Sequence, residues 1–280
     1  MKLHLIAISL LGLGLTGTPG FAAEMARPGA VNYVEGAVAI DGQAIAARDV
    51  GNAGLEPGQV LTTDAGRAKI LLTLGVFLRV DANSAVKMVS PDLTLTQVEL
   101  TRGRASVEVD EIHEQNNLQV IVGGVATRLE KTGYYEFNAD KSTVMVFKGK
   151  ATVQTADGKT REVKDHHELA LMAGPQKPVD FDAQAAKDDL YNWNSLRSQY
   201  LAEANNQMAG QYTGEGYAPG WYWNPYIWGY TFIGPGPFYS PFGWGFYPFG
   251  WTGGWYGGWS GGYYPHGGFG GGFHGGGGHR

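Results

Sequence analysis

Between Val31 and Met172 the apolar and polar positions alternate with a period of two. The alternation is clearest in four short segments, 37–40, 98–101, 105–109 and 143–147. Such a pattern places one face of a strand on a core and leaves the other in water. Turn sequences such as Asp41-Gly42 and Asp157-Gly158 separate the runs at intervals of about 8 to 12 residues. The pattern predicts an all-β module over residues 28–175, built as a sandwich, roll or barrel.

A short motif occurs three times in this module: glycine, a basic residue, alanine, a polar residue and a β-branched residue. The copies are Gly66-Arg67-Ala68-Lys69-Ile70, Gly103-Arg104-Ala105-Ser106-Val107 and Gly149-Lys150-Ala151-Thr152-Val153. Glycine permits a bend at the entry to a strand. We interpret the copies as equivalent strand starts, with the cation outward and the alanine at a close approach of two sheets.

Further motifs surround these copies. They are Gly54-Leu55-x-x-Gly58-x-x-Leu61-Thr62-Thr63, Gly75-Val76-Phe77-Leu78-Arg79-Val80, Val98-Glu99-Leu100-x-x-Gly103-x-Ala105 and Val144-x-Val146-Phe147-x-Gly149-x-Ala151-x-Val153. In order and number they resemble the FecR-like periplasmic domain, over roughly residues 31–172. The resemblance implies a mainly antiparallel β-roll or β-helical sandwich.

The resemblance also bears on function. Signalling members of the family carry an anti-sigma helical domain and a membrane helix ahead of this module, whereas only about 30 residues precede it here. The family's Arg-Gly-Thr-x-Phe element appears as Lys131-Thr132-Gly133-Tyr134-Tyr135, in outline only. We therefore expect no anti-sigma activity. A ligand- or partner-sensing module in envelope signalling, without its own anti-sigma domain, is the alternative that the family suggests.

The first 22 residues are typical of a secretory signal peptide. Lys2 supplies the positive charge, Leu5 to Leu15 is an apolar run of 11 residues, and Gly20 and Ala22 suit a cleavage point after Ala22. An uncleaved anchor is the less favoured alternative, because a membrane-spanning helix needs about 20 apolar residues. We expect an exported protein without a transmembrane anchor, located in the periplasm or at the cell surface or outside it.

Residues 180–209 are predicted to form an α-helix. Asp180 or Asp182 suits its start and Gly210 its end. An apolar stripe recurs at spacings of three and four: Leu190, Trp193, Leu196 or Arg197, and Tyr200 or Leu201. We expect Trp193 to dock the helix on the β-module, covering a sheet edge. The alternative is a partner-binding helix.

The composition changes abruptly at Gly210. Residues 210–280 hold 25 of the 44 glycines, 24 of the 35 aromatic residues and only two charges. Dense glycine opposes order, and aromatic rings favour stacking and burial. We predict a largely disordered, adhesive tail that binds envelope polysaccharide or protein, or associates with itself; the alternative is that part of it folds over the β-module. The rings predicted to stack on a ligand are Trp221, Trp223, Trp228, Trp244, Trp251, Trp255 and Trp259.

The remaining chemistry favours a non-enzymatic protein with no cofactor. The chain has no cysteine, and its net charge of -5 provides no basic field for nucleic acid. Gly258-Trp259-Ser260-Gly261-Gly262 resembles a nucleophile elbow but lacks the acid that should follow the serine. The seven histidines form no expected metal site, and we interpret Asp110, Glu111 and Glu114 as a solvated acidic turn. The first functional hypothesis is an exported envelope protein, a rigid β-scaffold with an adhesive tail.

Overall fold

The computed structural model describes residues 26–113, 115–155, 158–172, 176–212, 220–224, 229–233 and 238–246. Its elements, in chain order, are β1 (Ala30–Ile40), β2 (Gln43–Ala44), the 3-10 helix η1 (Ala47–Asp49), β3 (Val60–Thr73), β4 (Val76–Val80), β5 (Ala85–Asp92), β6 (Leu95–Arg102), β7 (Arg104–Val109), β8 (Leu118–Val122), β9 (Val125–Leu129), β10 (Gly133–Asn138), β11 (Thr143–Lys148), β12 (Lys150–Gln154), β13 (Thr160–Lys164), β14 (His167–Ala170), β15 (Val179–Asp180), α1 (Asp189–Tyr212), β16 (Gly220–Asn224), β17 (Gly229–Ile233), β18 (Phe238–Tyr239) and β19 (Gly245–Phe246).

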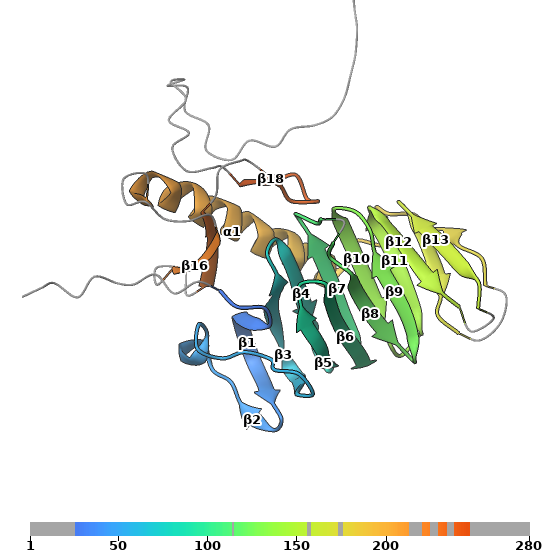
Figure 1. Ribbon diagram of the computed structural model, residues 1–280, viewed down its shortest axis with the longest axis horizontal. Coiled ribbons are helices and arrows are strands. Elements are labelled where there is room, and N and C mark those ends of the chain that lie inside the picture. Colours follow the sequence, from blue (N-terminus) through green and yellow to red (C-terminus); the bar gives the residue numbers. More distant parts are fainter. Residues whose placement is uncertain are drawn as a thin grey trace, which may run out of the picture.

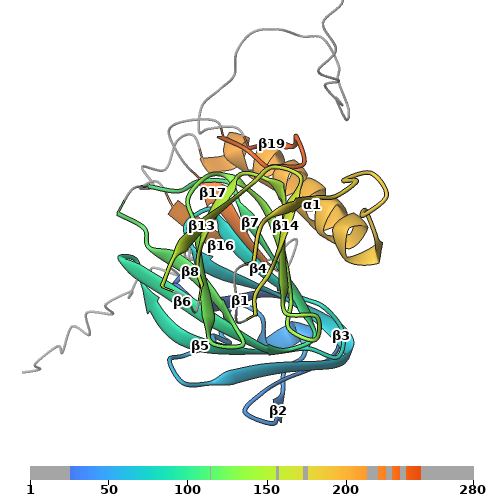
Figure 2. The ribbon, with the colours of Figure 1, turned by 90° about the vertical axis from the view of Figure 1, so that its right-hand side faces the viewer.

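Strands β1 to β15 form one large sheet that curls into a half-barrel (Figures 1 and 2). The main path runs β13-β12-β9-β8-β6-β5-β3-β4-β7-β10-β11-β14-β15, and β1 and β2 extend from β3. All pairs are antiparallel except β6 with β8, which run parallel. The predicted all-β, mainly antiparallel roll is confirmed.

Irregular pairing accompanies the curl. The register of β1 against β3 shifts between Val31 and Tyr33 and again between Gly36 and Val38. An extra residue in one strand bends it and strengthens its twist, so repeated bulges curve a sheet. At the second shift the backbones approach so closely that a Cβ on Gly66 would lie 2.6 Å from backbone atoms of Glu35 and Ala37.

The concave side of the sheet holds the main core. Alternate apolar residues of its strands, among them Ile70, Leu78, Val107 and Val144, are completely buried there. This is the inner face that the period-two pattern predicts. Asp41 and Gly42 adopt the two positive-φ positions of the tight β1–β2 turn, also as predicted.

The outer face of the central strands is covered as well, which corrects the expectation of a wet face. Every residue of β4 is buried, and so are five of the six residues in each of β7 and β10. The cover consists of α1 and the β16–β17 hairpin (Figure 2). Leu71 and Phe77 contribute to a second core with Trp221 and Phe232.

Helix α1 begins at Asp189, later than predicted. The Asp188 carboxylate accepts hydrogen bonds from the backbone N–H groups of Leu190 and Tyr191, at 3.0 and 3.1 Å, and so caps the helix. Asp182 caps a separate turn through Gln184 and Ala185 instead. The predicted start therefore mistook one capping carboxylate for the other. No helix of the described residues is long and apolar enough to cross a membrane.

The described residues of the tail that follow α1 contain two short hairpins. Residues 220–224 and 229–233 pair as a hairpin, and Phe238–Tyr239 pairs with Gly245–Phe246. The alternative in which part of the tail folds over the β-module holds for these segments. Residues 247–280 and the signal-peptide prediction over residues 1–22 lie outside the described residues.

The motif that occurs three times marks the start of a strand in two of its copies, and in the other copy its glycine lies inside a strand. Gly103 and Gly149 have positive φ and immediately precede β7 and β12, as expected, whereas Gly66 lies inside β3. The alanine of each copy is buried. The cation of each copy forms an ion pair at 2.6 to 2.8 Å: Arg67 with Asp81, Arg104 with Asp188, and Lys150 with Glu162.

Candidate functional site

Helix α1 packs on the sheet through polar side chains. Asn194, Ser198 and Asn205 are completely buried on its inner side, whereas Leu196 and Tyr200 on the outer side are about half exposed, at 46% and 51%. An amphipathic helix normally buries its apolar side. Helix α1 does dock on its own module, and its buried residues combine these three polar side chains with Leu190, Leu201, Ala202 and Ala204.

The sheet matches this polar side with polar groups of its own. Asn194 Nδ2 donates to Ser106 Oγ at 2.7 Å and to Tyr134 Oη at 2.5 Å. One turn later, Ser198 Oγ donates to Glu108 Oε1 at 2.6 Å. These bonds join α1 to β7 and β10. Because a buried polar group without a partner costs free energy, they fix the position of α1 on the sheet.

A charged pair lies beneath these bonds. Arg79 of β4 and Glu108 of β7 form an ion pair in which both side chains have no exposed surface. Asp110, two residues after Glu108, is also buried. Burial and the neighbouring Glu108 carboxylate raise the pKa of Asp110 well above its usual range. Asp110 is therefore a buried group, and its interpretation as part of a solvated turn was wrong.

A second set of charges lies near the start of α1. Arg104 contacts Asp188 at 2.6 Å and Glu136 at 3.2 Å, and Tyr134 Oη donates to Glu136 Oε1 at 2.7 Å. Burial raises the pKa of Glu136 to about 7, against the opposing effects of Tyr134 and Arg104. We refer to this set and the groups around Arg79 together as the polar layer: Arg79, Arg104, Ser106, Glu108, Asp110, Tyr134 and Glu136 of the sheet with Asp188, Asn194 and Ser198 near or on α1.

Lys69 lies at the margin of the polar layer. It is 2% exposed and faces the ring of Phe77, with its ammonium 5.2 Å from the ring centre. Burial, and then the nearby Arg197 and Arg79 guanidinium groups, hold its pKa well below the ordinary lysine value.

A cavity of about 300 Å³ opens beside Lys69, between the sheet, α1 and β17. Asn32, Lys69 and Arg197 line it together with Tyr200, Glu203 and Gly229. A larger hollow of about 620 Å³ lies by Arg104, Glu136 and Asp188, at the other end of the polar layer.

The tryptophans predicted to stack on a ligand divide into two groups. Trp228, Trp251, Trp255 and Trp259 lie outside the described residues. Trp221 is completely buried, edge-on to Phe77 at 4.9 Å, so its ring has no surface left for a ligand. This burial contradicts the contact predicted for Trp221.

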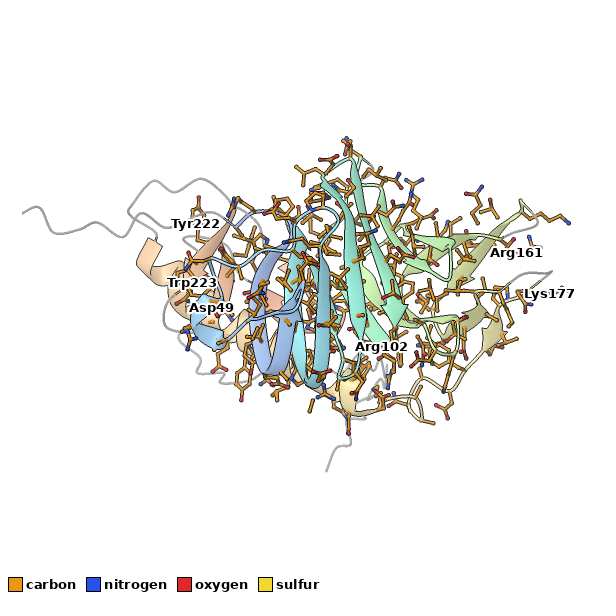
Figure 3. The ribbon with its side chains drawn as sticks, turned by 90° about the horizontal axis from the view of Figure 1, so that it is seen from below. Asp49, Arg102, Arg161, Lys177, Tyr222 and Trp223 are labelled. Carbon is orange, nitrogen blue, oxygen red and sulfur yellow. The ribbon has the colours of Figure 1, made fainter. Side chains whose placement is uncertain are left out.

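Trp223 and Trp244 are partly buried. Trp223 lies at the end of the molecule that carries Asp49, opposite the end that carries Arg161 (Figure 3). It packs on Gly51, where an added Cβ would come within 3.0 Å of the indole ring. Trp244 Nε1 donates to the Ser195 carbonyl of α1 at 3.2 Å. Both rings thus attach the start of the tail to the rest of the fold.

Sequence reasoning missed the polar layer because it assigned every polar strand position to solvent. One signal was available: Asn194, Ser198 and Asn205 are spaced by four and seven residues and so share one side of a helix. Their side lies next to the apolar stripe, which we took for the buried one.

The buried groups of the polar layer contact one another and α1. Within the described ranges, no group of three or more histidine, aspartate or glutamate residues is placed to hold a metal ion. The strongest buried carboxylates and cations already contact each other or α1. Nucleophilic catalysis requires a nucleophile beside a base that a third group orients. The polar layer is instead an arrangement that holds α1 to the sheet.

Comparison with known families identifies the domain to which most of this sheet belongs. The sequence profile described as FecR protein matches residues 58–171. These residues form a FecR domain. The FecR domain runs from β3 to β14 and supplies Lys69, Arg79 and Glu108 to the outer face of the sheet. Strand β1, helix α1 and the β16–β17 hairpin lie outside the matched residues.

Two solved structures are similar to part of this chain. Two crystal structures of a candidate anti-sigma factor from Parabacteroides distasonis are similar to this chain, with TM-scores of 0.38 and identities of 16% and 15%. The similarity covers 45% and 50% of this chain and 61% and 62% of the other chains. The chain thus spans about three fifths of the length of these proteins. No curated protein matches the chain.

Proposed function

We propose that this protein is a non-catalytic, partner-sensing module of an envelope signalling system. The FecR domain over residues 58–171 is the observation that carries the proposal. A role as partner-binding module also suits a body that holds a helix in a fixed position and shows no catalytic arrangement among its described residues.

The partner surface that we propose is the outer side of α1. Leu196 and Tyr200 lie one turn apart there, each about half exposed. Exposed apolar side chains that gather on one helix suit a protein partner better than water. The polar bonds of Asn194 and Ser198 beneath them keep this side presented outward. The occupant that we propose is a protein of the cell envelope.

Export belongs to the same proposal. The apolar run from Leu5 to Leu15 and the small residues Gly20 and Ala22 support cleavage after Ala22. Amino-terminal sequencing of the native protein, with fractionation of the cell, tests both the cleavage and the compartment. An intact Met1 on a cytoplasmic protein would contradict export.

The partner surface is tested by site-specific crosslinking. A photoreactive residue at position 196 or 200 of the full chain, expressed in its own host, is expected to capture one envelope protein. The purified pair should then bind directly, and Leu196→Glu with Tyr200→Glu should weaken that binding at least tenfold. Leu95→Glu on β6 is the matched control, because Leu95 is also an exposed leucine, at 37%, but lies outside α1.

The signalling part of the proposal is tested by a measurement that is separate from partner binding. Deleting the chain should change the transcripts controlled by one sigma factor, and wild type or Leu95→Glu should restore them. The Leu196→Glu, Tyr200→Glu variant should fail to do so while remaining folded. If that variant restores the transcripts and binds its partner normally, α1 is not the sensing surface.

The adhesive tail remains a prediction for residues 247–280. Truncation after Phe246 leaves all described elements in place and removes Trp251, Trp255 and Trp259. Loss of polysaccharide binding or of self-association in this truncated protein would support adhesion, and unchanged behaviour would contradict it.

A further inference from the structure

We propose that the cavity between Asn32, Lys69 and Arg197 is a binding site for a small oxyanion, a carboxylate or phosphate group. The proposal goes beyond the partner-sensing function and does not depend on it, although Tyr200, which lines the cavity, also belongs to the proposed partner surface. Three residues that carry nitrogen donors line it, and two of these donors are buried with no hydrogen-bond acceptor among the described residues.

Asn32 provides the first donor. It is the extra residue at the bulge where the register of β1 against β3 shifts between Val31 and Tyr33. Its Oδ1 accepts a hydrogen bond from the Tyr230 N–H at 2.6 Å, which fixes the direction of the amide. Its Nδ2 is buried and has no partner. Buried amide donors are normally paired, so an unpaired one on a cavity wall indicates a site for an acceptor.

Arg197 provides the second donor from the opposite wall. Its guanidinium lies flat over the ring of Tyr33, 3.6 Å from the ring centre, and this stacking holds it in place. Its Nε is buried and unpaired. An arginine fixed by stacking, with a free N–H, has the geometry that recognises carboxylates and phosphates.

Lys69 provides the third donor, and its neighbours explain why an anion is favoured. It is the register partner of Arg79 across β3 and β4, and Arg197 approaches it from α1. The other titratable groups near it are Glu108 on β7, Asp110 just after β7, and Tyr33, its register partner on β1. Glu108 is already paired with Arg79, and burial favours the neutral form of Asp110. An oxyanion in the cavity would supply the negative charge that this group of cations lacks.

The cavity size limits the ligand to a small molecule or one terminal group of a larger one. A volume of about 300 Å³ lies at the lower end of the range for small-molecule pockets. Glu203 lines the same cavity and is exposed, so it would repel a ligand that carries a second negative charge toward the opening.

Calorimetric titration of the full chain with sodium phosphate and, separately, sodium acetate tests the site, with sodium chloride at equal ionic strength as the reference. We expect saturable binding of at least one oxyanion. Lys69→Met and Arg197→Met, which keep most of each side chain's volume, should weaken it at least tenfold. Asn32→Asp should do the same, because it keeps the acceptor for Tyr230 and replaces the free donor by an oxygen. Arg48→Met removes an exposed arginine, 83% accessible, and should leave binding unchanged.

The two titrants separate the ligand types: binding of phosphate alone points to a phosphate group and binding of acetate alone to a carboxylate. Binding should also take up protons, measured as a dependence of the enthalpy on the ionisation heat of the buffer, because burial and the neighbouring guanidinium groups lower the pKa of Lys69 and a bound anion would raise it. The proposal is overturned if neither oxyanion binds beyond the chloride reference, or if the three variants bind like the wild type. If Lys69→Met binds the oxyanion as tightly as the wild type and binding takes up no protons, Lys69 is not part of the site. Circular dichroism of each variant establishes that it is folded.

Discussion

Lys69 on β3 and Arg79 on β4 are direct register partners on the outer face of the sheet, and both are buried. Like charges directly opposite each other destabilise a strand pair. Arg79 is compensated by Glu108, whereas Lys69 forms no ion pair among the described residues. Lys69 thus lowers the stability of the fold, which is the usual cost of a residue kept for binding.

Lys69→Met should stabilise the protein at pH 7. The substitution removes a buried amine and replaces it with an apolar side chain of similar length, so we expect a gain of about 1 kcal/mol or more in the free energy of unfolding. Urea unfolding provides the measurement. Lys148→Met, at an exposed position of β11, should change the stability by less than about 0.5 kcal/mol. A clear loss of stability in Lys69→Met would contradict the reading of Lys69 as an uncompensated group.

Two neighbouring carboxylates, Glu108 of β7 and Asp110 just after that strand, should differ in how much stability they lose on amide substitution. Glu108→Gln leaves the Arg79 guanidinium buried without its counter-charge, so a loss of about 3 to 5 kcal/mol is expected. Asp110→Asn should change the stability by less than about 1 kcal/mol at pH 7, because burial already favours the neutral carboxyl. Chemical denaturation of both variants tests this order, and the reverse order would refute the assignment of charges in the polar layer.

Glu136 should make the protein more stable in mild acid. Its pKa is raised from near 4.5 to about 7 in the folded state, so the folded protein holds this proton more tightly than the unfolded chain does. The resulting stabilisation is complete below pH 4.5 and is lost as the pH rises through 7. Between pH 5 and pH 8 this group alone should remove about 2 to 3 kcal/mol.

The comparison of Glu136→Gln with Glu99→Gln isolates that contribution. Urea unfolding at pH 5 and pH 8 should show a smaller pH dependence in Glu136→Gln than in the wild type. Glu99 lies on β6, away from the polar layer, and its substitution should leave the dependence as it is. Equal pH dependence in all three proteins would show that Glu136 titrates normally.

The start of the tail should be part of the folded body. Trp221→Ala removes the ring that packs on Phe77 and Phe232, and we expect it to cost about 3 to 5 kcal/mol. Truncation after Tyr212 should be at least as damaging, whereas truncation after Phe246 should leave the thermal midpoint nearly unchanged. If truncation after Tyr212 were harmless, the β16–β17 hairpin would not stabilise the sheet.

The sequence allowed the sheet to be predicted in outline because strand alternation and turn residues are local signals. Ile70, Leu78 and Val107 are buried as their pattern indicates, and Asp41-Gly42 forms the predicted turn. The outer face could not be predicted in this way. Whether Glu108 meets water or Ser198 depends on a helix 90 positions later in the chain, which no local pattern encodes.

The same limit explains the errors in the helix and the tail. Asp182 and Asp188 are equally good capping residues in sequence, and only the packing of α1 selects Asp188. Trp221 belongs to a glycine- and aromatic-rich segment whose composition favours adhesion, yet Phe77 provides a partner within the same chain. Composition describes what a segment can bind and leaves open whether the partner is its own fold.

Hydrogen exchange of the full chain most directly tests the claim that α1 and the β16–β17 hairpin are bonded to the FecR domain as one body. The backbone amides of residues 194–205 and 221–224 should exchange only through the opening that also exposes β4 and β7, with the same free energy. Exchange of these amides at the rate of an unprotected chain, while β4 and β7 remain protected, would contradict the account.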